Sequence, residues 1–377
     1  MAYRVQPGLH RELAKFGGGD ITACMNCGTC TAECPQTEEA GGFPRRIIHL
    51  LQVGHREKLA GSLEPWLCYY CGECSDSCPR DANPGETMMA ARRYLTAMYD
   101  WTGLGKRFYT SIWWEVGAIA LVALFVVGLF AFFHGPVVTD RVELNTFAPV
   151  KWVEIGDWIM GGVLAALLLS NGWRMARWVM GAGPRIRVPW SVYLRKVPVF
   201  FAHFATQKKW RECEGPRTRW LKHFLLVSGY VTMMVLVIVF LRWFQTDEIV
   251  PLYDPTRLLG YYATAALLYV TADFLWSRVK KTGSIHKFSE PTDWMFLSLL
   301  FLVALTGILV HVFRLAGFPL ATYSTYVIHL AIVVPMLVLE VPFGKWGHMF
   351  YRPFAAYLAA VKEEAVAGAA REAERAA

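Results

Sequence analysis

Residues 24–35 read Cys24-Met-Asn-Cys27-Gly-Thr-Cys30-Thr-Ala-Glu-Cys34-Pro35, which places four cysteines within eleven residues. The same spacing recurs 44 residues later, in Cys68-Tyr-Tyr-Cys71-Gly-Glu-Cys74-Ser-Asp-Ser-Cys78-Pro79. Both stretches follow C-x2-C-x2-C-x3-C-P, the spacing of bacterial ferredoxins that carry two 4Fe–4S clusters. A glycine at the same place in each run lets main-chain amides come close to the cysteine sulfurs. The sequence therefore predicts a domain that binds two 4Fe–4S clusters.

In this spacing, the fourth cysteine of each run ligates the cluster that the other run holds. We therefore expect one cluster on Cys24, Cys27, Cys30 and Cys78, and the other on Cys34, Cys68, Cys71 and Cys74. Two structural zinc sites are the alternative, but zinc sites use two C-x2-C pairs separated by a longer loop. The ninth cysteine, Cys213, lies in a basic segment with no cysteine nearby and is expected to be a bystander thiol.

Apolar residues recur at helical spacing between the two runs and again after the second run. Residues 43–54 carry Pro44 in the first turn and Gly54 at the end, which are start and stop signals of a helix. Residues 84–95, which also begin with a proline, are predicted to form a second helix. These patterns predict an α-helical ferredoxin domain over residues 1–105.

The composition excludes several classes of protein. Hydrophobic residues make up 55% of the 377 residues, charged residues make up 18%, and the mean hydropathy is +0.31. Such a chain is neither disordered nor a coiled coil. The net charge of +8 could indicate nucleic acid, but the basic residues flank apolar blocks, so no nucleic-acid partner is expected. No apolar run precedes the cysteines, so we expect no secretory signal peptide and a cysteine domain in the reducing cytoplasm.

From residue 112 onward, six apolar segments alternate with polar connections. Each is long enough, or nearly so, to cross about 30 Å of hydrocarbon at about 1.5 Å per residue. Six such segments in succession disfavour the alternative, a very hydrophobic soluble core. The predicted spans are 112–133, 153–173, 224–241, 258–276, 294–313 and 323–339. The sequence thus predicts an all-α protein with a six-span transmembrane helix bundle over residues 106–349 and a helical tail, exposed or frayed, over residues 350–377.

Lysine and arginine are unequally distributed among the connections. The connection 179–222 contains ten and 280–291 contains three. The other three connections, 134–152, 245–257 and 315–322, together contain only Arg141, Lys151 and Arg257. Positively charged connections stay on the cytoplasmic side, where they also contact anionic membrane lipid. Both termini and the ferredoxin domain are therefore predicted to be cytoplasmic, in a multi-pass protein of the cytoplasmic membrane.

Four histidines stand at the ends of predicted spans. An iron–sulfur domain joined to membrane helices needs a redox group in the membrane, and haem b held by two histidines is the usual one. His223 and His348 lie near the cytoplasmic side, and His311 and His329 lie near the opposite side. Pairing by depth therefore predicts one haem b on His223 and His348 and a second on His311 and His329.

The spacing of the last two histidines constrains this pairing. His329 and His348 lie 19 residues apart, about 28 Å along one helix, and therefore cannot share a haem. On an ideal helix they also point about 100° apart, and Pro335 and Pro342 are expected to bend the helix between them. His203, in an apolar stretch before a basic one, is an alternative ligand for one haem.

The cysteine runs and the last span resemble known redox families. The two C-x2-C-x2-C-x3-C-P runs look like those of the C subunits of heterodisulfide reductases. The last span, from His329 through Pro342-Phe343-Gly-Lys345-Trp-Gly-His348, is similar to that of the cytochrome b family that includes the E subunit of heterodisulfide reductase and the nitrate reductase gamma subunit. A fusion of both halves in one chain resembles the C subunits of the quinone-interacting membrane-bound oxidoreductase complexes of sulfate reducers.

This resemblance covers nearly the whole chain and implies two 4Fe–4S clusters, two haems b and menaquinone as substrate. It also implies cytoplasmic A and B partner subunits, which are flavin and iron–sulfur proteins, with adenylylsulfate reductase as the final acceptor in sulfate respiration. The chain departs from the nitrate reductase gamma subunit at one point. That family has two histidines ten residues apart on one helix, whereas Met233 stands ten residues after His223. The partners of His329 and His348 are therefore inferred from depth.

Together these features predict an electron-transfer subunit of a quinone-dependent oxidoreductase, in which electrons from menaquinol reach cytoplasmic partners. Ionisable residues within spans are often functional, so the acidic ones are candidates for proton transfer. They are Glu115, Asp273 and Glu340 near the cytoplasmic side, and Glu154 and Asp157 near the opposite side. No residue is assigned as catalytic. The alternatives are a subunit of a heterodisulfide-reductase-like or sulfite-reduction complex, and a haem-free membrane anchor for an iron–sulfur scaffold.

Overall fold

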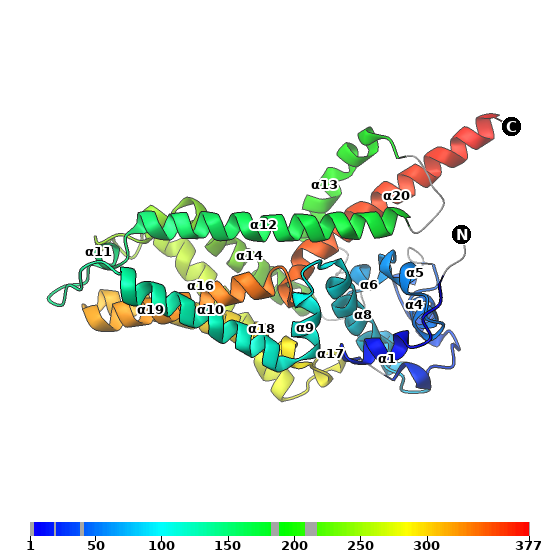
Figure 1. Ribbon diagram of the computed structural model, residues 1–377, viewed down its shortest axis with the longest axis horizontal. Helices are drawn as coiled ribbons and strands as arrows, with labels where there is room; N and C mark the ends of the chain where they lie inside the picture. The colour runs from blue at the N-terminus through cyan, green and yellow to red at the C-terminus, as the bar shows by residue number, and fades with distance from the viewer. Residues whose placement is uncertain (1–3, 19, 38–40, 182–187, 208–216, 377) are drawn as a thin grey trace.

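The computed structural model describes residues 4–18, 20–37, 41–181, 188–207 and 217–376. Within these ranges the regular elements are helices, and there is no strand. Figure 1 shows the short N-terminal helices, in blue, gathered at one end of a set of long helices. The expected all-α class is confirmed, with a small helical ferredoxin region followed by six long apolar helices.

The ferredoxin domain consists of short helices arranged around two longer ones. The helices expected at 43–54 and 84–95 correspond to α4 and α8. Asn83 caps α8 by accepting a hydrogen bond from the main-chain N–H of Glu86, as a residue with a short polar side chain does at a helix start. The elements are α1 (Leu9–Ala14), η1 (Ile21–Ala23), α2 (Thr29–Ala32), α4 (Arg45–Gln52), α5 (Arg56–Ala60), α6 (Glu64–Leu67), α7 (Glu73–Asp76), α8 (Pro84–Tyr99) and α9 (Leu104–Thr110).

Among the described residues, six helices are long and apolar enough to cross a membrane, which agrees with the predicted number of spans. Their apolar residues are widely exposed in the isolated chain: Leu121 is 70% exposed and Phe132 is 84% exposed. Such a surface fits hydrocarbon and not water. The helices are α10 (Ile112–Phe133), α12 (Val150–Gly181), α14 (Arg217–Val239), α16 (Pro255–Val279), α18 (Pro291–Leu315) and α19 (Pro319–Pro335), which continues into the π-helical segment η3 (Met336–Glu340).

The last span is not one continuous helix, so the expectation of a single helix from His329 to His348 was wrong. After η3 the chain turns, passes through the 3-10 segment η4 (Lys345–Gly347), and begins α20 (His348–Ala376). Proline lacks a main-chain donor and crowds the preceding turn. Pro335 ends α19, and Pro342 lies in the turn that follows η3. The angle between the two histidines is therefore set by this break and not by helical periodicity.

Outside the spans, one helix was not foreseen and another is more deeply buried than expected. The connection 179–222 contains α13 (Trp190–Thr206), which packs along α20. The tail expected to be exposed or frayed belongs to α20, whose first half is buried at Tyr351, Ala355 and Leu358. These residues share one hydrophobic core with α12 and the ferredoxin domain. The prediction for Cys213 lies outside the described residues, as do Arg185, Arg187, Lys208, Lys209 and Arg211 of the same connection.

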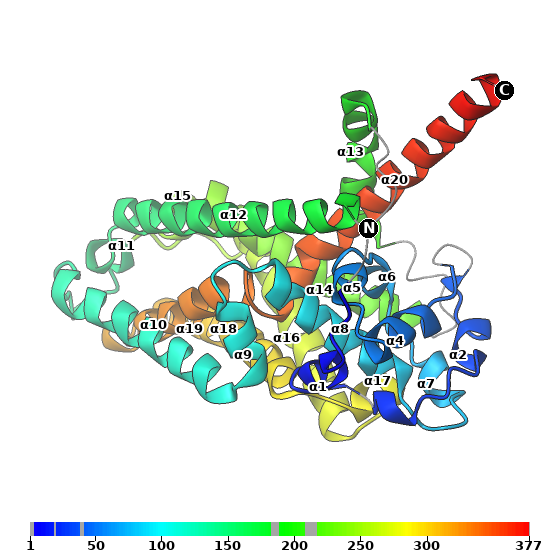
Figure 2. The same cartoon turned by 45° about the vertical axis from the view of Figure 1, so that its right-hand side comes forward.

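The ferredoxin domain is held against the membrane helices by core packing and by buried charges. Arg93 on α8 reaches Asp293 on α18 at 3.1 Å, and the side chains of both residues are less than 10% exposed. Lys345 approaches the second oxygen of the same carboxylate at 2.5 Å. Arg174 on α12 donates to the main-chain oxygens of Tyr99 and Met98 at the end of α8. These contacts fix where the cysteine runs lie relative to the spans, and Figure 2 shows α8 beside the membrane helices.

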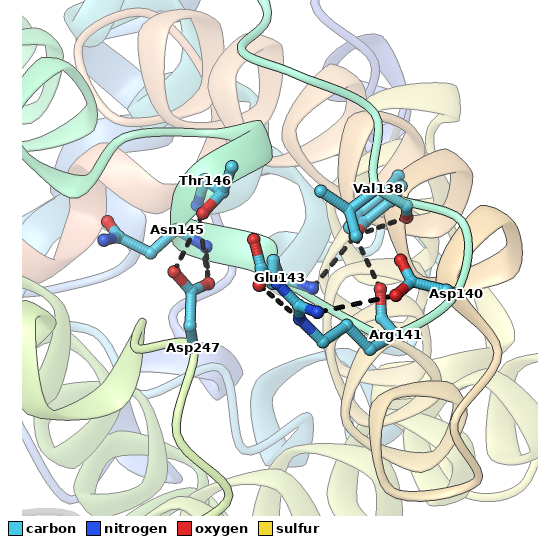
Figure 3. Close-up of polar contacts among 8 residues, drawn as sticks. Val138, Asp140, Arg141, Glu143, Asn145, Thr146 and Asp247 are labelled. Carbon is cyan, nitrogen blue, oxygen red and sulfur yellow. Dashed lines mark hydrogen bonds and ion pairs between the residues drawn. The ribbon is translucent and has the colours of Figure 1, made fainter.

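At the far end of the helices, two connections are joined by hydrogen bonds (Figure 3). Asp247 accepts from the main-chain N–H of Asn145 at 2.5 Å and from the hydroxyl of Thr146 at 3.1 Å. Arg141 pairs with Glu143 at 2.5 Å. Both connections contain few basic residues, and they close the bundle on the side opposite the ferredoxin domain.

Replacing Asp293 by Asn tests the docking contact. The substitution leaves Arg93 and Lys345 without their counter-charge, and removing one partner of a buried ion pair costs about 3–5 kcal/mol. We expect D293N to lower the melting temperature of the purified chain in detergent and to expose the α8–α9 junction to limited proteolysis.

The matched control is D140N. It removes an exposed carboxylate beside Arg141, an ion pair worth about 0–1 kcal/mol. If D293N had the melting temperature and cleavage pattern of D140N, the docking role of Asp293 would be contradicted.

Candidate redox centres

Each cysteine run turns at a glycine and enters a short helix. Gly28 precedes α2 with φ 95°, and Gly72 precedes α7 with φ 100°. This left-handed conformation is strained for residues with a Cβ. It turns the main chain around the cysteines, and the amide of Tyr70 donates to the sulfur of Cys68 at 3.3 Å. Hydrogen bonds to sulfur tune iron–sulfur clusters, so this geometry fits the group that the spacing predicts.

The first group of sulfurs combines both runs. The helices α2 and α7, which contain the third cysteine of each run, contact each other, so the two runs lie side by side. Burial is the main cause of the raised pKa of the Cys30 thiol. The neighbouring sulfurs that raise it further are those of Cys24, Cys27 and Cys78. These four cysteines are the set that the sequence assigns to one cluster.

The second group of sulfurs lines a cavity in the ferredoxin domain. The four cysteines in its wall are Cys34, Cys68, Cys71 and Cys74, and Phe43 and Met88 add apolar surface. Burial, together with the neighbouring sulfurs of Cys68 and Cys71, raises the pKa of the Cys34 thiol to about 11. The structure thus brings together the second set assigned from the sequence, with its fourth member supplied by the first run.

All eight cysteines of the two runs are free thiols. The described residues contain no group of three or more donors close enough to hold a single metal ion. A zinc site draws its four sulfurs to about 2.3 Å from one ion, whereas the four sulfurs of a 4Fe–4S site each bind a different iron of a larger cube. Among the described residues, the cysteines therefore do not form the compact group that a zinc site requires.

Tyr69 separates the second cysteine group from a pocket that contains histidines. Tyr69 lines the cavity of Cys68 and also a second cavity, at the ferredoxin side of the membrane helices. The three histidines in that second cavity are His203, His223 and His348. We call this second cavity the histidine pocket. The two cavities therefore share one aromatic wall.

His223 and His348 face each other across the histidine pocket, with ring centroids 6.4 Å apart. Two imidazoles on opposite sides of one metal, each bound at about 2 Å, have centroids at roughly this separation. His223 Nδ1 lies 2.5 Å from the Gln207 side-chain oxygen, and His348 Nδ1 lies 2.5 Å from the main-chain oxygen of Lys345. Such bonds fix the tautomer and the ring orientation of metal-ligating histidines. Burial lowers the pKa of His348 to about 3, so its ring is neutral.

The other predicted pair is not brought together in this way. His311 Nε2 lies 2.8 Å from the hydroxyl of Tyr261, and His329 Nδ1 lies 2.9 Å from the hydroxyl of Thr306. A Cβ at Gly307 would stand 3.2 Å from the His329 ring, so the glycine allows close packing there. Within the described residues, no ring contact joins His311 to His329. The far-side pair therefore fits a shared metal less well than the pair in the histidine pocket.

Two of the candidate proton-transfer acids are buried together. Glu115 and Glu340 are 3% and 2% exposed, and their carboxyl groups interact. The main-chain N–H of Lys345 donates to Glu340 at 2.9 Å, and one oxygen of Glu115 has no partner among the described residues. Asp273 differs, because it forms an ion pair with Lys222 at 2.7 Å.

Sequence reasoning missed the residues between the two cavities. Arg352 lies over the ring of Tyr69, with its guanidinium carbon 4.4 Å from the ring centroid. Arg92 on α8 donates to the main-chain oxygens of Pro65 and Cys68. Two features of the sequence indicate Tyr69 and Arg352. Tyr69 follows a cysteine directly, and Arg352 stands one helical turn after His348.

The comparisons with known proteins support the iron–sulfur centres of the N-terminal domain. Residues 23–83 match the family described as 4Fe-4S dicluster domain. The N-terminal domain is a 4Fe–4S dicluster domain. It is also similar to the C subunit of the ferredoxin:CoB-CoM heterodisulfide reductase of Methanosarcina mazei, with 34% identity over 82 residues, which are 22% of this chain and 50% of the relative.

A second relative is the iron–sulfur C subunit of the CoB–CoM heterodisulfide reductase of Methanopyrus kandleri, 36% identical over 72 residues. That match covers 19% of this chain and 38% of the relative, so the chain spans half or less of the curated relatives it matches. No solved structure matches the chain. The dicluster domain is thus distantly related to the C subunits of heterodisulfide reductases, and six candidate membrane helices follow it.

Paired substitutions test which cysteines share a cluster. If the fourth cysteine of each run ligates the cluster of the other run, C24S/C78S removes two ligands of one cluster, and the protein keeps about four non-haem irons. C68S/C78S then removes one ligand of each cluster, and the protein keeps about none. Iron analysis of the purified variants, with EPR spectra of the reduced protein, measures the difference.

The two double variants control for each other, since each removes two thiols from the same domain. The opposite result, with C24S/C78S losing both clusters and C68S/C78S losing one, would show that each run holds its own cluster.

Proposed function

We propose that the protein is a membrane electron-transfer subunit of an oxidoreductase. In this proposal it links menaquinol in the membrane to flavin and iron–sulfur partners, the A and B subunits, on the cytoplasmic side. The clusters are proposed to lie on the two cysteine sets, with Cys24, Cys27, Cys30 and Cys78 in one and Cys34, Cys68, Cys71 and Cys74 in the other. Haem b is proposed on His223 with His348, and on His311 with His329.

One observation carries this proposal: Tyr69 lines both the cavity of the second cysteine group and the histidine pocket. Bound haem and clusters supply one-electron chemistry, and the protein's part is to hold them close and to exclude water. With Tyr69 as the one residue that lines both cavities, a single aromatic side chain would lie between the two bound groups. A scaffold whose clusters were only structural would have no need of a histidine pocket against them.

The histidine pocket also supports the choice of haem over a simple membrane anchor. His223 and His348 come from separate helices, and the Nδ1 atom of each lies against an oxygen, as is usual for histidines that bind a metal through Nε2. His203 lines the same pocket and stays an alternative ligand. On the far side, His311 must exchange its bond to Tyr261 for a metal, or bind through its other nitrogen.

Menaquinol releases two protons with its two electrons, so the membrane domain needs proton acceptors. Glu115 and Glu340 are buried near the ferredoxin side, where the charged groups of Lys345 and Asp293 lie close by. We propose that this pair accepts protons, which favours a quinol site on the same side. Asp273 is a weaker candidate because Lys222 already neutralises it.

The partners and the sidedness are proposals of the same kind. The A and B subunits, and adenylylsulfate reductase as final acceptor in sulfate respiration, follow from the resemblance of the whole chain to the membrane subunit of sulfate reducers. Cytoplasmic termini follow from the basic connections. The names of the relatives favour a second candidate, a subunit of a heterodisulfide-reductase-like complex. In both candidate complexes, this chain would transfer electrons in the same way.

Substitution of single histidines tests the haem assignment. H223A and H311A should each lower the haem content of the purified chain from about two to about one, because each removes one ligand of a different site. The dithionite-reduced minus oxidised optical spectrum, normalised to protein, measures the content.

The control is H134A, since His134 is exposed and bonds to the neighbouring Gly135 oxygen at 2.6 Å. A wild-type chain without haem b bands would contradict the proposal and support a haem-free anchor.

A further inference from the structure

Two arginines lie between the second cysteine group and the histidine pocket. Arg92 donates to the main-chain oxygens of Pro65 and Cys68, and Arg352 donates through Nε to the main-chain oxygen of Trp66 at 3.1 Å. Within the described residues, neither has a carboxylate partner. Within the described residues, these two positive charges therefore face neutral carbonyl groups and the sulfur of Cys68, and neither is paired with a carboxylate.

The Nη2 group of Arg352 is buried and has no hydrogen-bond partner within the described residues. Leaving a buried donor unpaired costs about 1–3 kcal/mol, and more for a charged group. A planar guanidinium with a free edge matches a carboxylate, which accepts two parallel hydrogen bonds. The unpaired donor therefore indicates an anion that binds here.

The position of Arg352 indicates which anion. Arg352 lines the histidine pocket, one helical turn after His348 on the same face of α20. Its guanidinium also stacks on Tyr69, which fixes the direction of the side chain. A group held between His223 and His348 would lie beside this guanidinium, and haem b carries two carboxylates, its propionates, at one edge.

We propose that Arg352 binds a propionate carboxylate of the haem held by His223 and His348. This inference rests on the proposed function. Arg352 is a positioning residue: it neutralises the carboxylate, raises the reduction potential of that haem, and orients one edge of it toward Tyr69 and the second cysteine group. A positive charge beside a haem favours the reduced form, because reduction adds one negative charge.

Optical redox titration of the purified full-length chain tests this role in R352Q and R352K. In R352Q the lost positive charge should shift the reduction equilibrium of one haem about tenfold toward the oxidised form, which is about 59 mV for one electron. The other haem should keep its potential. R352K retains the charge and should shift the equilibrium less than threefold.

The matched control is R174Q, since Arg174 also joins a long helix to main-chain oxygens of the ferredoxin domain but lies outside the histidine pocket. R174Q should leave both potentials unchanged. Unchanged potentials in R352Q with full haem content would overturn the inference. So would loss of the folded chain in both R352Q and R352K, which would make Arg352 a support of the Trp66 segment.

The two proposals fail in different ways. If the wild-type chain binds no haem b, both the proposed function and this inference are contradicted. If the wild-type chain binds two haems and R352Q leaves both reduction potentials unchanged, only the inference about Arg352 is contradicted.

Discussion

The distance between the cysteine groups and the membrane helices is the constraint on which any electron transfer in this protein depends. That distance is fixed by a common hydrophobic core, in which α12 and α20 pack with the ferredoxin domain. It is also fixed by the carboxylate of Asp293, which meets Arg93 and Lys345. Because both contacts are buried, the ferredoxin domain is held as part of the membrane structure and not tethered to it.

The elements that follow from local sequence were predicted well. The cysteine spacing gave the dicluster domain because three close thiolates and a following proline suit one kind of site. The six spans followed from apolar length, and α10 has the predicted bounds. At Pro335 and Pro342 a bend was expected, and the structure has a full break after Pro335. The buried start of α20 was missed, since it depends on packing against the ferredoxin domain. The helix α13 was missed because its connection was examined only for its charge.

The histidine pairs show more clearly what could not be predicted from the sequence. The position of a residue along a span predicts its depth in the membrane, and both histidine pairs were assigned from depth alone. It does not give rotation about a helix axis, and the structure places His223 opposite His348 but turns His311 toward Tyr261. The role of Tyr69 was also out of reach, because it depends on the fold placing the residue after Cys68 against a helix almost 300 residues later.

Whether electrons cross the wall at Tyr69 can be measured directly. The dithionite-reduced chain is mixed with an oxidised menaquinone analogue, and the reoxidation of the iron–sulfur clusters is followed in wild type and in H348A, after cluster content has been matched by EPR. The shared wall predicts rapid cluster reoxidation in wild type and clusters that stay reduced in H348A. Reoxidation at the same rate in both proteins would show that the electrons take another path.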